Sequence, residues 1–227
     1  MKKTKKKILV VALIVSLVAI LSLGSLAWFT ANDTVTNTIK LADDFAVDVY
    51  ETDGEGNLIT EGDETVGVTY TNLMPGQEIH KDPTVRNTGT HPEWVRVHVT
   101  LSHYNIWSVA VKPDKETGKV DLSTIFTGFD PNAWKRYEEP TIDENANTVT
   151  YTFYLDTIKL EPNQAAALFT GVTIPGELTS EQAKTMNGSF TIAVEAEAIQ
   201  SEYLPEEVTT AHDAFALLET EAEEETD

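Results

Sequence analysis

Alternating apolar and polar residues predict most of the strands in this chain. Four apolar side chains occupy every second position between residues 94 and 101: Val95, Val97, Val99 and Leu101. The same pattern occurs between residues 148 and 155: Val149, Tyr151, Phe153 and Leu155. A period of two is typical of a strand that buries one face, so both stretches are predicted strands of a half-buried sheet.

Tight turns separate the predicted strands of residues 69–101, the stretch around which the rest of the chain is organised. Pro75 presets the φ angle of one turn position, and Gly76 tolerates a positive φ at the next. A second turn is predicted at residues 87–89 (Asn-Thr-Gly). Pro83 lies in the strand between these turns, and because proline has no N–H to donate, that strand is expected at a sheet edge. The local prediction is an antiparallel β-meander.

Further strands are predicted on both sides of this stretch, at residues 45–49, 167–174 and 190–198. One short helix is predicted over residues 179–186, with Ser180 as its candidate N-cap, and a short helical turn within residues 123–134. About nine short strands separated by turns, with almost no amphipathic helix, are typical of a sandwich. The predicted fold class is therefore all-β: an antiparallel two-sheet sandwich with one or two short helices.

The N-terminus has the three parts of a secretory signal peptide. Several lysines precede an uncharged, largely apolar run at residues 8–23, and the small residues Ser25 and Ala27 occupy the −3 and −1 positions of a cleavage site. Cleavage before Trp28 makes residues 1–27 a signal-peptide helix that is absent from the mature protein. The alternative is an uncleaved membrane anchor, although the apolar run is shorter than the ~20 residues that span a bilayer comfortably.

The chain carries a net charge of −21 and contains no cysteine. So large a negative charge disfavours binding of the folded part to nucleic acid or anionic lipid, and membrane contact is expected only through the uncleaved precursor. Acidic residues are concentrated in residues 219–227, and a like-charged run of this kind is usually solvated and disordered. We therefore expect a β-domain over residues 28–203 and an acidic, disordered tail over residues 204–227.

Three features, in order along the chain, are similar to one family: the residues after the proposed cleavage site, a pair of turn motifs and the start of the last strand. Trp28 and Phe29 follow the proposed cleavage site directly. Residues 72–76 (Asn-Leu-Met-Pro-Gly) and 85–89 (Val-Arg-Asn-Thr-Gly) precede the valine-alternating strand, and residues 187–192 (Asn-Gly-Ser-Phe-Thr-Ile) open the last strand. In this order and spacing the motifs resemble the TasA/camelysin family, whose members are secreted, fibre-forming proteins of Gram-positive biofilm matrices.

The resemblance implies a secreted structural protein with a jelly-roll fold, processed by a signal peptidase of the SipW type. It also implies self-assembly, in which each subunit completes a neighbour's sheet with its own N-terminal segment, a donor-strand arrangement. The apolar anchors expected in that segment are Trp28, Phe29, Val35, Ile39 and Leu41. The strand containing Pro83 is the expected neighbour of the gap, and the alternative to a donor strand is an N-terminus that merely frays.

Some camelysins are described as metalloproteases, so the resemblance also carries an enzyme alternative. None of the histidines lies in the H-E-x-x-H motif of zinc proteases. A metal site formed across strands by His98, His80 and a carboxylate is an alternative that the sequence leaves undecided. A Ca²⁺ loop in residues 51–57 is another such alternative, although the Asp-Gly pair there favours a plain hairpin.

Motifs for other enzyme classes are absent from the sequence, including the nucleophile elbow, the P-loop and the glycine-rich dinucleotide turn. The prediction is therefore a protein without catalytic residues, cofactor or metal. A surface adhesion module that does not polymerise is the remaining alternative.

Overall fold

The computed structural model describes residues 30–34, 37–39, 46–61, 64–65, 73–186 and 190–224. Several predicted features lie outside these residues: the signal peptide with Ser25 and Ala27, and the anchors Trp28, Phe29, Val35 and Leu41. Within the described residues, no helix is both long enough and apolar enough to cross a bilayer.

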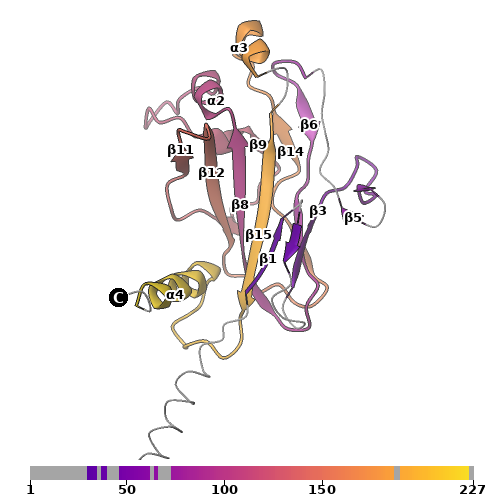
Figure 1. Ribbon diagram of the computed structural model, residues 1–227, viewed down its shortest axis with the longest axis vertical. Coiled ribbons are helices and arrows are strands. Elements are labelled where there is room, and N and C mark those ends of the chain that lie inside the picture. Colours follow the sequence, from indigo (N-terminus) through magenta and orange to yellow (C-terminus); the bar gives the residue numbers. More distant parts are fainter. Residues whose placement is uncertain are drawn as a thin grey trace, which may run out of the picture.

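One large antiparallel sheet forms the main layer of the molecule (Figure 1). Its strands follow the order β10 (Trp134–Lys135), β12 (Thr148–Leu155), β8 (Glu93–Ser102), β15 (Ile192–Gln200), β1 (Thr30–Thr34) and β2 (Asn37–Ile39). β11 (Thr141–Asp143) pairs with β12 on the same side as β10. The two long central strands, β8 and β15, pair over nine residues.

Smaller antiparallel sheets make up the rest of the β-structure. One contains β13 (Ala165–Ala167), β7 (Thr84–Asn87) and β3 (Val47–Tyr50), and another contains β6 (Glu78–His80), β14 (Gly171–Thr173) and β9 (Phe126–Thr127). β4 (Thr60–Glu61) and β5 (Glu64–Thr65) form a separate pair. The prediction of an all-β, antiparallel protein is confirmed.

The main core lies between the large sheet and the smaller ones. All eight residues of the two alternating patterns in β8 and β12 are buried, which confirms the predicted faces of these strands. Aromatic side chains from different elements meet them there, and the rings of Phe126 and Phe169 stack with centroids 4.4 Å apart. Burial of this apolar surface is the main force that holds the layers together.

The predicted β-meander is wrong, because β6, β7 and β8 belong to three different sheets. Pro83 lies in the link between β6 and β7 rather than in a strand, and β7 is the middle strand of its sheet. The missing N–H of Pro83 therefore costs no ladder hydrogen bond. Its carbonyl instead accepts the N–H of Leu168 at 2.9 Å.

The strand predicted over residues 167–174 is likewise divided, into β13 and β14. Leu168 and Phe169 are consecutive and both fully buried, which a regular strand with one buried face does not allow. Gly171 then begins β14 where a Cβ atom would lie 2.6 Å from Thr127 Oγ1 and 3.1 Å from the Ile79 carbonyl oxygen. The absence of a side chain at Gly171 lets β14 approach both of its neighbours.

Three short helical segments cap this β-structure. α2 (Tyr104–Ala110) was not predicted, η1 (Leu122–Ile125) overlaps the predicted helical turn, and α3 (Ser180–Thr185) matches the predicted helix. The N-cap of α3 is Thr179 rather than Ser180. Thr179 and Gln182 form a reciprocal capping box, which satisfies two N–H groups at the start of the helix.

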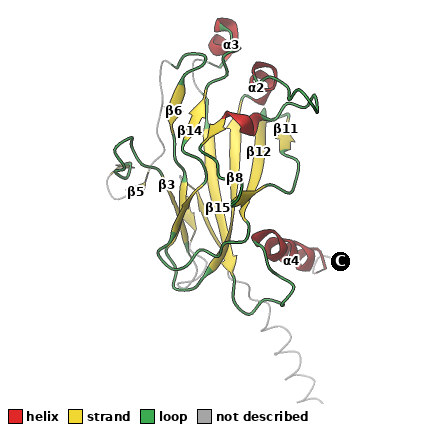
Figure 2. Cartoon of the chain, turned by 180° about the vertical axis from the view of Figure 1, so that it is seen from behind, coloured by secondary structure: helices red, strands yellow, loops and turns green. Residues whose placement is uncertain are grey.

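For the described residues 204–224 the prediction of a disordered tail is wrong, because α4 (Ala211–Glu224) folds against the outer face of the large sheet (Figure 2). Its buried residues Ala211, Ala214 and Phe215 contact a second apolar cluster from the sheet: Trp94, Tyr154 and Ile199. The Arg96 guanidinium lies 4.3 Å from the Phe215 ring centroid and donates to Glu219 at 2.6 Å. The apolar stripe of the helix thus outweighs the repulsion among its acids.

Candidate functional site

The described part of the N-terminal segment lies at the edge of the large sheet, where β1 pairs with β15. The expectation that the strand containing Pro83 would be its neighbour is wrong, because Pro83 lies in the link between β6 and β7, and β7 pairs with β13 and β3. β1 pairs with β15 along its whole length, from Thr30 opposite Ile199 to Thr34 opposite Glu195. β2 pairs with the other side of β1. Without β1, the N–H and C=O groups along this side of β15 would have no strand to pair with, and such an edge readily accepts another strand.

The composition of β1 is unusual for a strand next to a core. Its sequence is Thr-Ala-Asn-Asp-Thr, so it contains no large apolar residue. It forms a main-chain ladder with β15 and also contacts β3. A strand held mainly through its backbone can be replaced by any segment that offers the same backbone and small or polar side chains.

The inner face of β15 is apolar and made of small residues. Val194, Ala196 and Ala198 are buried, and β3 contacts both β15 and β1. Val47 and Val49 of β3 are buried in the same cluster. The β15 edge therefore borders the main core.

The outer face of β15 carries a charged network. Arg96 donates to Glu197, and His98 Nε2 lies 3.5 Å from the same carboxylate. Burial by itself raises the pKa of Glu197, but the hydrogen bond from His98 and the charge and hydrogen bond of Arg96 outweigh it and lower the pKa to about 2. Glu197 thus stays ionised and ties β15 to β8.

A buried carboxyl group holds the chain at the point where the N-terminal strands join the core. Glu93, which is fully buried, accepts the N–H of Ala46 through Oε1 at 3.0 Å, directly before β3. Its other oxygen has no hydrogen-bond partner among the described residues. Burial raises the pKa of Glu93 to about 8, so the carboxyl is protonated at neutral pH.

Among the predicted anchors, only Ile39 lies within the described residues, in β2 opposite Asn32 of β1. β2 pairs with β1 and not with β15, so Ile39 does not lie beside β15 itself. The strand pairing with β15 was not visible in the sequence, because β1 is polar and short.

The residues of the alternative metal sites are not brought together. His98 lies on the outer face of β8 and interacts with Thr152 and Glu197, whereas His80 lies on β6 near Asp82. In the 51–57 loop, the Asp53 carboxylate accepts the N–H groups of Glu55 and Asn57 and so closes the turn. No group of three or more potential metal-binding side chains occurs in the part of the chain that the structure describes.

Comparison with known proteins finds no matching family model, no matching curated protein and no matching solved structure.

Proposed function

We propose that this protein is a secreted structural subunit that assembles with copies of itself into extracellular matrix fibres by exchange of β1. The proposal includes a jelly-roll arrangement of the strands and removal of residues 1–27 by a signal peptidase of the SipW type. The observation that supports it is the pairing of β1, a terminal strand without large side chains, at a sheet edge that borders the core. The role is structural rather than catalytic.

Strand exchange would conserve the hydrogen bonds that β1 makes. β1 of one subunit would pair with β15 of the next in the same register, so the closed monomer and the fibre have equivalent ladders. The closed form is favoured by the effective concentration of a tethered strand, on the order of millimolar for a short linker. Fibres are therefore favoured by a high local concentration of subunits. They are also favoured when the apolar anchors next to β1 pack more closely against a neighbouring subunit than against their own.

A disulfide trap distinguishes the closed form from the exchanged one, because the chain has no cysteine of its own. Ala31 lies opposite Ala198 in the β1–β15 ladder. Opposed residues have Cβ atoms about 4.5–5.5 Å apart, which a disulfide can bridge with a small adjustment. In the mature protein carrying Ala31→Cys and Ala198→Cys, oxidation after fibre growth should give a ladder of covalent multimers on a non-reducing gel.

The matched control is Thr100→Cys with Ala193→Cys, a pair opposed between β8 and β15. Both strands belong to the body of the subunit, so this variant should give only an intramolecular disulfide. Removal of residues 28–36 should leave a folded protein that makes no fibres. If the Ala31/Ala198 variant yields only monomers although fibres are present, β1 is not the exchanged strand.

A further inference from the structure

A lysine and a glutamate meet inside the protein, close to the end of β3. Glu51 follows β3 and continues its buried face, because side chains alternate along a strand and Val47 and Val49 are buried in the same way. Lys81 follows β6 and likewise comes two residues after the buried Ile79. The side chains of Lys81 and Glu51 are only 7% and 1% exposed. An ammonium and a carboxylate thus occupy positions where the strand pattern favours apolar residues.

The two charged groups are in direct contact. Lys81 Nζ donates to Glu51 Oε1, and Glu51 Oε2 has no hydrogen-bond partner among the described residues. Neighbouring residues hold the same two segments together, since Asp82 accepts the N–H of Thr52 at 2.7 Å and also accepts the Thr52 hydroxyl. The lysine nitrogen is therefore held next to the carboxyl group in a fixed arrangement. Groups held in this way react as if they were highly concentrated.

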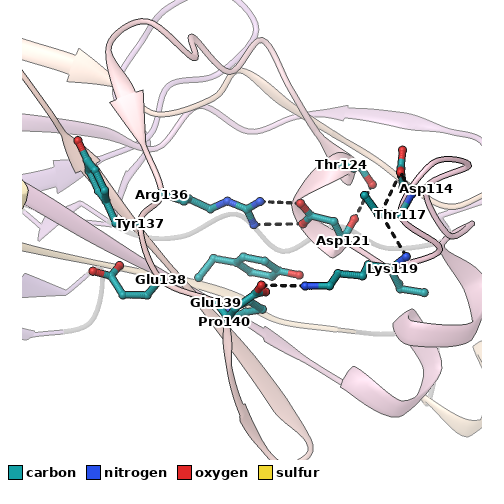
Figure 3. A pocket seen from close by; sticks show the side chains of 12 residues that line it. Asp114, Thr117, Lys119, Asp121, Thr124, Arg136, Tyr137, Glu138, Glu139 and Pro140 are labelled. Carbon is teal, nitrogen blue, oxygen red and sulfur yellow. Dashed lines mark hydrogen bonds and ion pairs between the residues drawn. The ribbon is translucent and has the colours of Figure 1, made fainter.

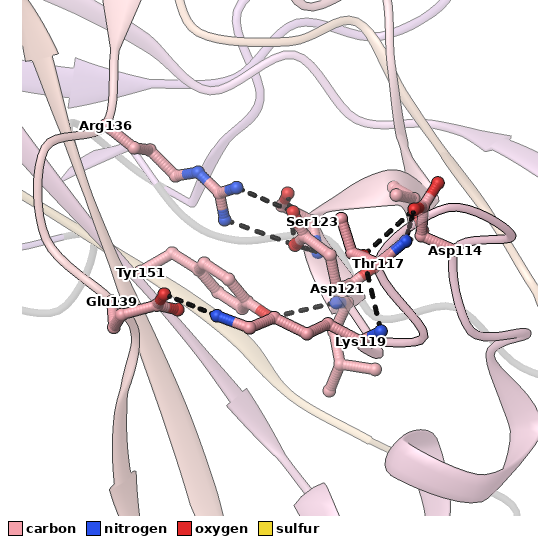
Figure 4. A network of polar contacts seen from close by, with 10 residues as sticks. Asp114, Thr117, Lys119, Asp121, Ser123, Arg136, Glu139 and Tyr151 are labelled. Carbon is pink, nitrogen blue, oxygen red and sulfur yellow. Dashed lines mark hydrogen bonds and ion pairs between the residues drawn. The ribbon is translucent and has the colours of Figure 1, made fainter.

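Another lysine–glutamate pair has a different environment, at the edge of the large sheet near β10 and β11. Lys119 donates to Glu139 at 3.0 Å beside a polar cleft, which lies between the 114–121 loop and the segment from β10 to β11 (Figure 3). Next to this pair, Arg136 donates to both oxygens of Asp121 at 3.1 and 2.6 Å (Figure 4). The Lys119 and Glu139 side chains are 72% and 82% exposed, so water solvates both charges and stabilises the ionic form.

Burial makes the ionic form of the Lys81–Glu51 pair costly. Each ion loses hydration that a single partner replaces only in part, and the unpartnered Glu51 Oε2 adds to this cost. Transfer of one proton to the carboxylate gives two neutral groups, and the neutral amine is the nucleophilic form of lysine. Condensation of the amine with the carboxyl group would remove both charges permanently.

We propose that Lys81 and Glu51 condense to an amide, which cross-links their side chains. A proton passes along the hydrogen bond from Nζ to Oε1, and the amine attacks Cδ to form the Nζ–Cδ bond. A second proton moves from Nζ to Oε1, the Cδ–Oε1 bond breaks, and Oε1 leaves as water. One ammonium and one carboxylate thus give one amide and one water, without an oxidant or a cofactor. Burial of the amide keeps out the water that would hydrolyse it.

The cross-link braces the part of the domain that contacts β1. It joins the end of β3 to the link that leads into β7, between two positions that are thirty residues apart. β3 in turn contacts β1 and β15. In a chain without cysteine, such a bond restrains the unfolded state as a disulfide would. The inference does not depend on the assembly proposal, because neither Lys81 nor Glu51 belongs to β1.

Mass spectrometry of the exported protein, unfolded and digested with trypsin, tests the cross-link. Without the amide, trypsin cleaves after Lys81 and releases residues 41–81 with their full mass, since residues 41–80 contain no lysine or arginine. With the amide, Lys81 has no charge for trypsin to recognise. We therefore expect residues 41–86 as one peptide that is lighter by one water. A glutamate-specific protease should then cut between Glu51 and Lys81 without separating the two parts.

Lys81→Arg keeps a cation beside Glu51 but cannot form this amide, so this variant should show the full mass. The matched control is Lys119→Arg at the exposed pair, which should still lose the water. The proposal is overturned if trypsin cleaves the parent protein after Lys81 and the peptide has its full mass. It is equally overturned if the water is missing although trypsin cleaves after Lys81, because a succinimide at Asp53 would give that result. The measurement on the parent protein decides the question even if Lys81→Arg fails to fold.

Discussion

Substitution of Glu93 by Gln should remove a strong pH dependence from the stability of the domain. Glu93 is completely buried, and burial raises the pKa of its carboxyl from 4.5 to about 8 in the folded protein. Between these two pH values the folded protein binds a proton that the unfolded chain has released. The free energy of unfolding therefore falls as the pH rises from 4.5 to 8, and the contribution of Glu93 is constant above that range.

The size of this pH effect on the free energy of unfolding follows from the shift in the pKa of Glu93. One pKa unit corresponds to about 1.4 kcal/mol, so a shift from 4.5 to about 8 amounts to roughly 5 kcal/mol in total, of which about 4 kcal/mol lies between pH 5 and pH 9. Such a change is comparable to the whole stability of many domains, about 5–15 kcal/mol. Gln is of similar size and keeps an oxygen for the Ala46 N–H, but it does not titrate.

Urea unfolding of the parent protein and of Glu93→Gln at pH 5, 7 and 9 measures the effect. The stability of the parent relative to the variant should fall by about 4 kcal/mol from pH 5 to pH 9. Glu195→Gln, at an exposed position of β15, is the matched control for loss of a carboxyl on the same sheet. If the parent and Glu93→Gln show parallel pH profiles, the Glu93 carboxyl is not buried in the way described here.

Two further predictions concern packing and export. Gly171→Ala should destabilise the domain by roughly 1–3 kcal/mol in urea unfolding, because the new Cβ would lie 2.6 Å from Thr127 Oγ1 and 3.1 Å from the Ile79 carbonyl oxygen. The matched control is Gly176→Ala, which should be nearly neutral because no atom lies within 4 Å of its Cβ position. Equal stability of the two variants would contradict the close approach of β14 to its neighbours. N-terminal sequencing of the exported protein should begin at Trp28, and Ala27→Phe should leave the precursor in the membrane fraction. Recovery of a secreted chain that retains residues 2–23 would refute the cleavage prediction.

The sequence by itself determined which residues of the long strands face the core. In β8 and β12, apolar residues at every second position bury one face, because a strand directs successive side chains to opposite sides. The sequence also predicted the tight turn at Pro75 and Gly76. Gly76 has a φ of 82°, and the Gln77 N–H bonds to the Met74 carbonyl at 3.0 Å, as expected of the predicted Pro-Gly turn.

Only the tertiary structure decided which strands pair. β6, β7 and β8 are consecutive in the chain but lie in three sheets, because their partners come from segments up to about a hundred residues away, and local pattern carries no information on such pairing. The prediction of a disordered tail was based on the charge of residues 204–227, and it failed for a related reason. The apolar stripe of α4 is stable only where Trp94, Tyr154 and Ile199 offer an apolar face on the outside of the sheet.

The N-terminal strand and the Arg136–Asp121 ion pair differ in how far the sequence could predict them. The N-terminal segment was predicted as the assembly element from its position and its resemblance, but its pairing with β15 required the fold. The ion pair between Arg136 and Asp121 had no sequence signal, because the two residues are fifteen positions apart and each is an ordinary surface residue. They meet because β10 and β11 both pair with β12, which places the segment between these strands opposite the 114–121 loop.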